Sequence, residues 1–441
     1  MRMRNVRCLW SMVAATLIAA GCNNATGTSN VPPDASADAP DSALSPRDLD
    51  ATLSWYGTNR EKLNAMLAAL GQRAATYNAA NKPVAVFDWD NTVAKNDVGD
   101  ATFFWMVKND KVLQPAGKDW KTRSPYLTAD AVTALNNACD AAADAGKALP
   151  TSTNTACADE LLSIYATAQT TGNLAAFAGY NPRRMEPNYA FGAHVFAGYS
   201  AAAAGELAEL AVSENLAAAV DATQKIGSNN FTAWIRIYDP VKDLIGALQD
   251  NGFDVWIVSA SAQYIVEQAA RRVGIAANRV VGIRLVEAAG LLTGALQGCG
   301  GVPDGATDAT ALITYIDGKR CWINKAIYGD TSAAALTKTA DPARRPVFGA
   351  GDSDTDITFL KDATALKLVI NRNKQEVMCN AYSNAGGHWI VNPMFLQPKV
   401  QLTSGYACTT SACKDDKAAS IPCVDEDAQP IADQQDSVYG P

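Results

Sequence analysis

Residues 82–92 have the sequence KPVAVFDWDNT, and this stretch decides the fold. Its apolar run, residues 84–87, predicts a buried strand of a parallel sheet. The strand ends in two carboxylates two residues apart, Asp88 and Asp90. At the carboxyl end of a strand in an α/β sheet, such side chains face the crevice where ligands bind. The same pattern also occurs in an ordinary polar loop after a strand, so the rest of the chain must distinguish the two.

Other apolar runs downstream end in polar side chains as well. The run in residues 252–258 ends at Ser259, and the run in residues 346–351 ends at Asp352. Apolar spacing predicts helices at residues 238–248 and 262–273, and a further strand at residues 366–370. Strands that alternate with helices in this way predict an α/β fold with a doubly wound, Rossmann-like parallel sheet.

Four motifs, taken in chain order, resemble those of the haloacid dehalogenase superfamily of phosphohydrolases. They are DxDxT at residues 88–92, a strand-end serine at Ser259, Gly-Lys at residues 318–319 and GDSxxD at residues 351–356. The resemblance covers residues 82–100 and 238–395 and is to the phosphoserine-phosphatase-like members. It implies a hydrolase of phosphoric monoesters that acts on a small phosphorylated substrate.

The resemblance also implies a role for each polar residue. Asp88 would be the nucleophile that forms an aspartyl phosphate, and Asp90 the general acid and base. Ser259 and Lys319 would bind the phosphate and assist catalysis. Lys325 is an alternative to Lys319, although Gly-Lys at the start of a helix fits the family pattern better.

Mg²⁺ is the cofactor that the resemblance implies. A phosphate monoester brings about two negative charges to those of Asp88 and Asp352, so the site needs cations. Mg²⁺ prefers oxygen ligands, including one or two carboxylates. The implied ligands are Asp88, Asp352 and the backbone carbonyl of Asp90, with Asp356 orienting the lysine or the metal-bound waters. Asp354 competes with Asp356, but the spacing favours Asp356.

A long insertion separates the first two motifs. Residues 97–237 are rich in alanine, with helical runs predicted at residues 129–146, 159–172 and 201–226. We expect a mainly helical cap domain over the catalytic face, although a separate domain with its own partner is an alternative. The predicted divisions are a signal peptide at 1–22, a disordered tether at 23–50, a catalytic core at 51–96 and 238–400, the cap at 97–237, and an extension at 401–441.

Parts of the insertion look like segments of bacterial phosphorylcholine phosphatases, which suggests choline phosphate as the substrate. An aromatic cage could then bind the quaternary ammonium group through cation–π attraction. The candidate aromatic residues are Trp89, Trp105, Tyr189 and Phe191, each of which could equally belong to the core. Phosphoserine would instead need groups for a carboxylate, and Arg183 and Arg184 are candidates.

The N-terminus has the pattern of an export signal. Three arginines precede an apolar run at residues 9–20, which is too short for a membrane span. Residues 17–22 (LIAAGC) resemble a bacterial lipobox, so Cys22 would carry a lipid anchor and provide the only membrane contact. We therefore expect an exported, periplasmic or cell-envelope protein, with Asn23 favouring the outer membrane.

Eight further cysteines support export. An even number in an oxidising compartment indicates disulfides. We predict the local pairs Cys139–Cys157 and Cys299–Cys321, with the last four cysteines bridging the C-terminal region. They are Cys379, Cys408, Cys413 and Cys423.

Charge and composition exclude other functions. The 441 residues carry a formal net charge of −8, which argues against nucleic-acid binding. The two histidines, His194 and His388, lack the spacing of a metal site or catalytic triad and are expected to be structural. The alternatives that remain are a phosphoserine-type or broad-specificity phosphatase, a phosphotransferase, and a non-catalytic surface binding protein.

Overall fold

A computed structural model describes residues 45–440 of the chain. These residues belong to one compact unit, Leu44–Pro441. The predicted signal peptide, the lipid-anchor residue Cys22 and the tether up to residue 44 lie outside the described residues. No helix in the described range is both long enough and apolar enough to cross a membrane.

The core is a six-stranded sheet in the order β12-β11-β10-β1-β6-β7, and all neighbouring strands pair in parallel. The predicted doubly wound α/β fold is therefore confirmed. Four of its strands were expected from the sequence, and the two edge strands β7 and β12 were not. The strands are β1 (Val84–Phe87), β6 (Asp254–Ala262), β7 (Val280–Ile283), β10 (Phe348–Gly351), β11 (Leu366–Asn371) and β12 (Trp389–Pro393).

Helices cover both faces of this sheet. Successive residues of β1 alternate between two apolar clusters, since Ala85 and Phe87 belong to one and Val84 and Val86 to the other. Burial on both sides explains why the strand is a continuous apolar run. The helices are α1 (Asn59–Leu70), α7 (Asp239–Asp250), α8 (Gln263–Ala270), α9 (Asp317–Ala326), α10 (Ile357–Asp362) and α11 (Gln375–Ser383).

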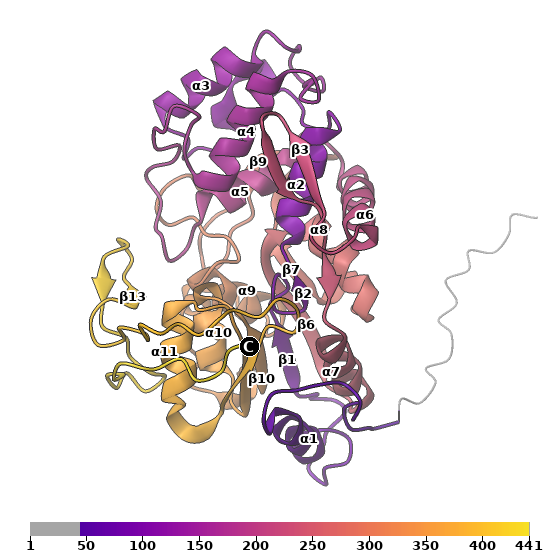
Figure 1. Cartoon of the computed structure of the whole chain (residues 1–441), viewed down its shortest axis with the longest axis vertical. Helices are drawn as coiled ribbons and strands as arrows, with labels where there is room; N and C mark the ends of the chain where they lie inside the picture. The colour runs from indigo at the N-terminus through magenta and orange to yellow at the C-terminus, as the bar shows by residue number, and fades with distance from the viewer. Residues whose placement is uncertain (1–44, 441) are drawn as a thin grey trace, which may run out of the picture. The chain divides into compact units, whose positions relative to one another are not determined.

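The insertion contains five α-helices, which Figure 1 shows in violet and magenta beside the hairpin strand β3. A short antiparallel pair, β2 (Ala94–Lys95) with β5 (Arg236–Ile237), joins the points where the insertion leaves and returns. The helices are α2 (Val98–Lys108), α3 (Ala129–Cys139), α4 (Thr155–Thr167), α5 (Pro187–Ala193) and α6 (Ala201–Ala217).

The helix predicted at residues 201–226 is wrong in its last third. It ends at Ala217, and the chain continues as a hairpin of β3 (Thr223–Ile226) and β4 (Asn229–Thr232). Gly227 lies in the turn with a φ of 55°, a conformation that glycine adopts at little cost. A second hairpin, β8 (Leu285–Ala288) with β9 (Leu291–Leu296), was also not predicted.

Residues 45–50, predicted as the end of the tether, pack against the core instead. Arg47 forms ion pairs of 2.7 Å with Asp243 and 2.6 Å with Asp250, both on α7. Leu49 is buried. The predicted boundary at residue 50 is therefore too late, because Arg47 and Leu49 contact the core and the composition of this segment does not indicate such contacts.

The structure has four disulfides, and both predicted local pairs are confirmed. Cys139 is bonded to Cys157, at the ends of α3 and α4, and Cys299 is bonded to Cys321 on α9. The other two bonds link Cys379 to Cys408 and Cys413 to Cys423. The first of these ties α11 to the C-terminal extension, where the only strands are the two-residue β13 (Cys413–Lys414) and β14 (Ser420–Ile421).

Candidate active site

The carboxyl edge of the sheet brings together three carboxylates from two neighbouring strands. The backbone N–H of Asp88, just after β1, donates to the carbonyl oxygen of Ala350 on β10 at 2.9 Å. One carboxylate oxygen from each of Asp88, Asp352 and Asp356 lies within 4.8 Å of the others, and all three residues are buried. Three of the predicted site residues therefore form one cluster.

Lys319 neutralises part of this cluster. Its Nζ donates to Oδ1 of Asp88 and to Oδ1 of Asp356, each at 2.6 Å, and its side chain is 0% exposed. Burial alone lowers the pKa of Lys319, but the ion pairs with Asp356 and Asp88 outweigh it and raise that pKa. Lys319 is thus a permanent positive charge beside Asp88. The alternative Lys325 donates instead to the carbonyl of Gly298 at 2.7 Å.

Asp356 holds Lys319 in place. Its Oδ2 accepts hydrogen bonds from the backbone N–H groups of Asp352 at 3.0 Å and Ser353 at 3.1 Å. A Cβ on Gly351 would come within 2.6 Å of the Asp356 side chain, so this close approach requires glycine. The competing Asp354 points elsewhere and accepts from the N–H of Val377 at 2.9 Å, in the first turn of α11.

The oxygens of Asp88 and Asp352 are suited to a cation. Thr92 Oγ1 lies 3.3 Å from Oδ2 of Asp88 and 3.0 Å from Oδ1 of Asp352, and its single proton can serve only one of them at a time. Burial raises the pKa of Asp88 to about 7, against the opposing effect of Lys319, and Asp352 adds to the rise. Two buried carboxylates that repel each other form a donor set that a divalent cation would stabilise.

Asp90 accepts hydrogen bonds from the insertion and from β6. Its Oδ1 accepts from the N–H of Val98 at 2.7 Å, and its Oδ2 accepts from the hydroxyl of Ser261 at 2.7 Å. Burial raises the pKa of Asp90 well above its usual value, and Asp97 and Asp88 raise it further. A carboxyl group whose pKa is raised is suited to donate a proton.

Ser259 does not line the cavity beside these carboxylates, whereas Ser261 does. Ser259 is fully buried, and its hydroxyl oxygen accepts from the N–H of Ser261 at 3.1 Å. Strand β6 continues to Ala262, so the residue at its open edge is Ser261. The Ser259 hydroxyl also lies 3.4 Å from Oδ2 of Asp90, so both serines contact that carboxylate, and Ser261 is the one of the two that lines the cavity.

A small cavity opens in front of the carboxylates. Its volume is about 60 Å³, and Asp88, Asp90 and Asp352 line it together with Tyr165 and Tyr189 of the insertion. A second cavity of about 360 Å³ shares both tyrosines with the first. The insertion therefore contributes directly to the walls of the site.

Arg372 is a site residue that the sequence did not reveal. It follows β11, lines both cavities, and its guanidinium donates to Oδ2 of Asp352 at 2.6 Å. Burial lowers the pKa of Arg372, but Asp352 raises it more strongly, so the side chain stays charged. Its place directly after a predicted strand was the available signal, since the carboxyl ends of parallel strands share one edge.

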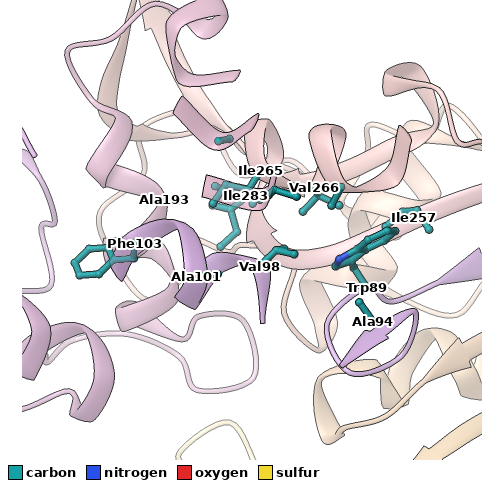
Figure 2. Close-up of a cluster of buried hydrophobic side chains, with 14 of the residues drawn as sticks. Trp89, Ala94, Val98, Ala101, Phe103, Ala193, Ile257, Ile265, Val266 and Ile283 are labelled. Atoms are coloured by element: carbon teal, nitrogen blue, oxygen red, sulfur yellow. The ribbon is translucent and has the colours of Figure 1, made fainter. Parts of the chain in front are cut away.

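The predicted aromatic cage is wrong in three of its four members. Trp89 is 1% exposed and lies among buried apolar side chains such as Ile257 (Figure 2). Trp105 donates from Nε1 to Glu214 at 2.6 Å, and Phe191 packs against Phe103 with ring centroids 6.2 Å apart. These three rings are buried and belong to the same hydrophobic cluster. Only Tyr189 of the four lines the cavities.

The second cavity has a different set of aromatic and acidic residues. Burial raises the pKa of both Asp97 and Asp100, in the latter case to about 7. Tyr165 donates to Oδ1 of Asp100 at 2.8 Å. The aromatic residues that line this cavity are Phe104, Tyr165, Tyr189 and Trp234.

The two candidate arginines for a substrate carboxylate line neither cavity. Arg183 pairs with Glu376 at 3.3 Å and with Asp317 at 3.6 Å. Arg184 is the next residue, and its carbonyl oxygen accepts from the N–H of Ile313 at 2.9 Å. His194 is buried, and among the described residues neither of its ring nitrogens has a hydrogen-bond partner. The expected structural role of His194 agrees with this placement.

Comparisons with known proteins agree with the fold and with the cluster. A doubly wound parallel sheet with buried carboxylates and a lysine at its carboxyl edge is an α/β fold with a ligand-binding edge. Residues 149–361 match the family model of haloacid dehalogenase-like hydrolases. This segment of the chain resembles that superfamily of hydrolases. The matched segment contains Ser259, Lys319, Asp352 and Asp356 but begins after Asp88 and Asp90.

One solved structure shows the same fold, and two others are less similar. A conserved protein of unknown function from Anaerococcus prevotii is 20% identical, with a TM-score of 0.54 over 77% of this chain and 93% of its own. A Bordetella pertussis protein of unknown function is 14% identical, with a TM-score of 0.41 over 71% of this chain and 100% of its own. A substrate-bound phosphoserine phosphatase is 13% identical, with a TM-score of 0.27 over 66% of this chain and 86% of its own. Among curated proteins, no sequence matches this chain.

Proposed function

We propose that this hydrolase releases phosphate from a small phosphate monoester, with Asp88 as the nucleophile. The observation that carries the proposal is the position of Asp88. Asp88 lines a cavity together with Asp90, and its carboxylate lies 2.6 Å from the fixed charge of Lys319. A carboxylate, a cation and a proton donor are the groups that phosphoryl transfer through an aspartyl phosphate needs.

The steps follow from these positions. Asp88 attacks phosphorus, a bond forms between its carboxylate oxygen and phosphorus, and the ester P–O bond breaks. Asp90, whose pKa is raised by burial, gives its proton to the departing alkoxide oxygen. A water molecule then attacks the phosphorus, Asp90 takes up a proton from it, and the Asp88 carboxylate is released with inorganic phosphate.

Asp88 and Asp352 would hold Mg²⁺, with the backbone carbonyl of Asp90 as a third oxygen ligand. When bound, the ion would neutralise charge on the phosphoryl oxygens. Asp356 contributes indirectly, because both of its oxygens already accept hydrogen bonds from Lys319, Asp352 and Ser353.

We propose that the alcohol part of the substrate carries a positive charge, as choline phosphate does. The second cavity supports this, since Asp97 and Asp100 lie beside aromatic rings that attract cations. Phosphoserine, the alternative, also has a cation but adds a carboxylate. The proposed preference for choline phosphate thus depends on these acidic residues rather than on Trp89 and Trp105.

The first test is phosphate release from p-nitrophenyl phosphate in the presence of Mg²⁺. We expect turnover by the wild type and its loss in D88N, while circular dichroism shows that the fold is retained. D354N is the matched control, because Asp354 is a partly buried carboxylate of the same loop that accepts a hydrogen bond from α11. Sustained activity of D88N would show that Asp88 is not the nucleophile.

The second test compares substrates. We expect kcat/KM to be higher for choline phosphate than for phosphoserine and ethyl phosphate, and the advantage over ethyl phosphate to disappear in D100N. Equal rates for choline phosphate and ethyl phosphate would refute recognition of the cation. A higher rate for phosphoserine would favour the alternative.

We also propose that the protein is exported and anchored through a lipid on Cys22. The four disulfides support export, since such bonds persist in oxidising compartments. Cell fractionation tests the anchor: the wild type should sediment with membranes and C22A should not. Release of the wild type into the soluble periplasmic fraction would contradict the anchor but not export.

A further inference from the structure

We propose that Arg372 is a phosphate-binding residue and that the C-terminal extension, residues 401–441, positions it. This inference rests on the proposed phosphatase function and assigns a role to a segment whose sequence suggests none. Figure 1 shows the extension in yellow, near the strands that end at the candidate site.

Arg372 is the cation that faces the incoming phosphate. Of the residues that line the first cavity, it is the only one with a positive charge, against the carboxylates of Asp88, Asp90, Asp97 and Asp352. Lys319 does not line this cavity and is fully buried behind Asp88. A guanidinium group offers paired donors that match phosphoryl oxygens, so Arg372 is suited to bind the substrate dianion.

Both chain neighbours of Arg372 are held by other segments near the C-terminus. The side-chain amide of Asn371 donates to Oδ1 of Asp436 at 3.0 Å and to the carbonyl of Val438 at 2.7 Å. Asn373 accepts from the hydroxyl of Tyr406 at 3.3 Å. Asn373 also has a φ of 60°, a conformation that needs support in a residue other than glycine.

Asp436 is the centre of this attachment. It is 2% exposed and also accepts hydrogen bonds from the hydroxyl of Tyr382 at 2.5 Å and from the N–H of Leu402 at 2.8 Å. No cation pairs with it among the described residues. A buried carboxylate satisfied only by polar neighbours fixes their geometry, because losing one partner is costly.

The extension is itself fixed to the core. The disulfide Cys379–Cys408 links it to α11, and Cys413–Cys423 closes a loop within it. Lys367 of β11 pairs with Glu426 at 2.5 Å. The segment that contains Asp436 therefore has a defined position against β11, the strand that leads to Arg372.

The experiment is a double-mutant cycle on kcat/KM for p-nitrophenyl phosphate. R372A should lower it by about 10- to 100-fold, the range for loss of a charge-assisted contact. Asp436 is a positioning residue, so D436N should lower it by a smaller factor of about 3- to 10-fold. The double variant should equal R372A alone, because Asp436 acts only through Arg372.

Inorganic phosphate gives an independent measure of binding. Its inhibition constant should rise in R372A and D436N, and R372K should recover part of the affinity. D433N is the matched control, since Asp433 lies in the same extension but bonds only to Thr409 and should behave as the wild type. Y382F removes one hydroxyl from Asp436 and replaces D436N if that variant is not recovered folded.

The outcomes separate the two proposals. An inactive wild type would overturn the phosphatase function. An active wild type with unchanged kcat/KM in R372A would overturn the role of Arg372 alone. Folded D436N or Y382F with wild-type kinetics, or a D436N effect that multiplies that of R372A, would overturn positioning by the extension.

Discussion

Replacing Lys319 with methionine should destabilise the protein in a way that can be calculated from the site. The change keeps the volume of the side chain but removes two hydrogen bonds of 2.6 Å, one to Asp88 and one to Asp356. Bonds to charged groups contribute about 1.5–3 kcal/mol each, which gives about 3–6 kcal/mol for the pair. Removing one partner of a buried ion pair costs about 3–5 kcal/mol, in agreement with that range.

Thermal unfolding followed by circular dichroism at pH 7.5 in EDTA measures the loss. The entropy of unfolding is about 2.1 cal/mol/K per residue, so 441 residues and about 4 kcal/mol correspond to a fall in Tm of about 4 °C. The fall should shrink at pH 5.5, where the carboxyl group of Asp88, with its pKa raised to about 7 by burial, is protonated.

K325M is the matched control for this measurement. Lys325 lies on the same helix, α9, and donates a single hydrogen bond to a carbonyl oxygen. Its loss should cost about 1 kcal/mol, and the Tm should fall by about 1 °C. If K319M melted within 1 °C of the wild type, or no lower than K325M, the buried ion pairs would not stabilise the fold as argued.

Three further predictions test other parts of the structure. The C139A/C157A variant should lose about 3 kcal/mol of stability in urea unfolding, because the bond closes a loop with a sequence separation of 18 residues. Burial lowers the pKa of His194 to about 3, so the free energy of unfolding falls as pH drops below about 6.5. Relative to H194L, the wild type should lose about 2 kcal/mol of stability between pH 7.5 and 5. A stability difference between the two proteins that does not change with pH would contradict this. D90N should lower kcat by about 10²- to 10⁴-fold for an alkyl phosphate and less for p-nitrophenyl phosphate, whose leaving group needs no proton. An equal fall in kcat for both substrates would exclude Asp90 as the acid.

Local sequence identified the parts of the site that follow apolar strands. Asp88 and Asp352 could be predicted because a buried strand has a visible apolar run and its carboxyl end is where ligands bind. Ser261 was missed because the apolar run of β6 stops at residue 258, whereas the strand itself continues to Ala262. The cysteine pairs close in sequence could be predicted because short loops are the simplest to close.

Features that depend on distant contacts could not be predicted. Trp89 and Trp105 are residue types that can form a binding cage, but both are buried by tertiary packing. Arg372 follows a predicted strand, yet the contacts that hold its loop come from residues 33 to 67 positions away from their partners. The edge strand β12 could not be predicted for the same reason, since it forms through pairing with β11.

The disulfide between Cys299 and Cys321 has a consequence for how the enzyme matures. Cys321 lies two residues after Lys319 on α9, so the oxidation that forms this bond also fixes the helix that presents the lysine. A chain produced in a reducing cytosol would contain Asp88 but lack this restraint on Lys319, its charge partner. Specific activity should therefore increase during oxidative refolding in step with this bond, and a purified sample's turnover would report how completely it has been oxidised.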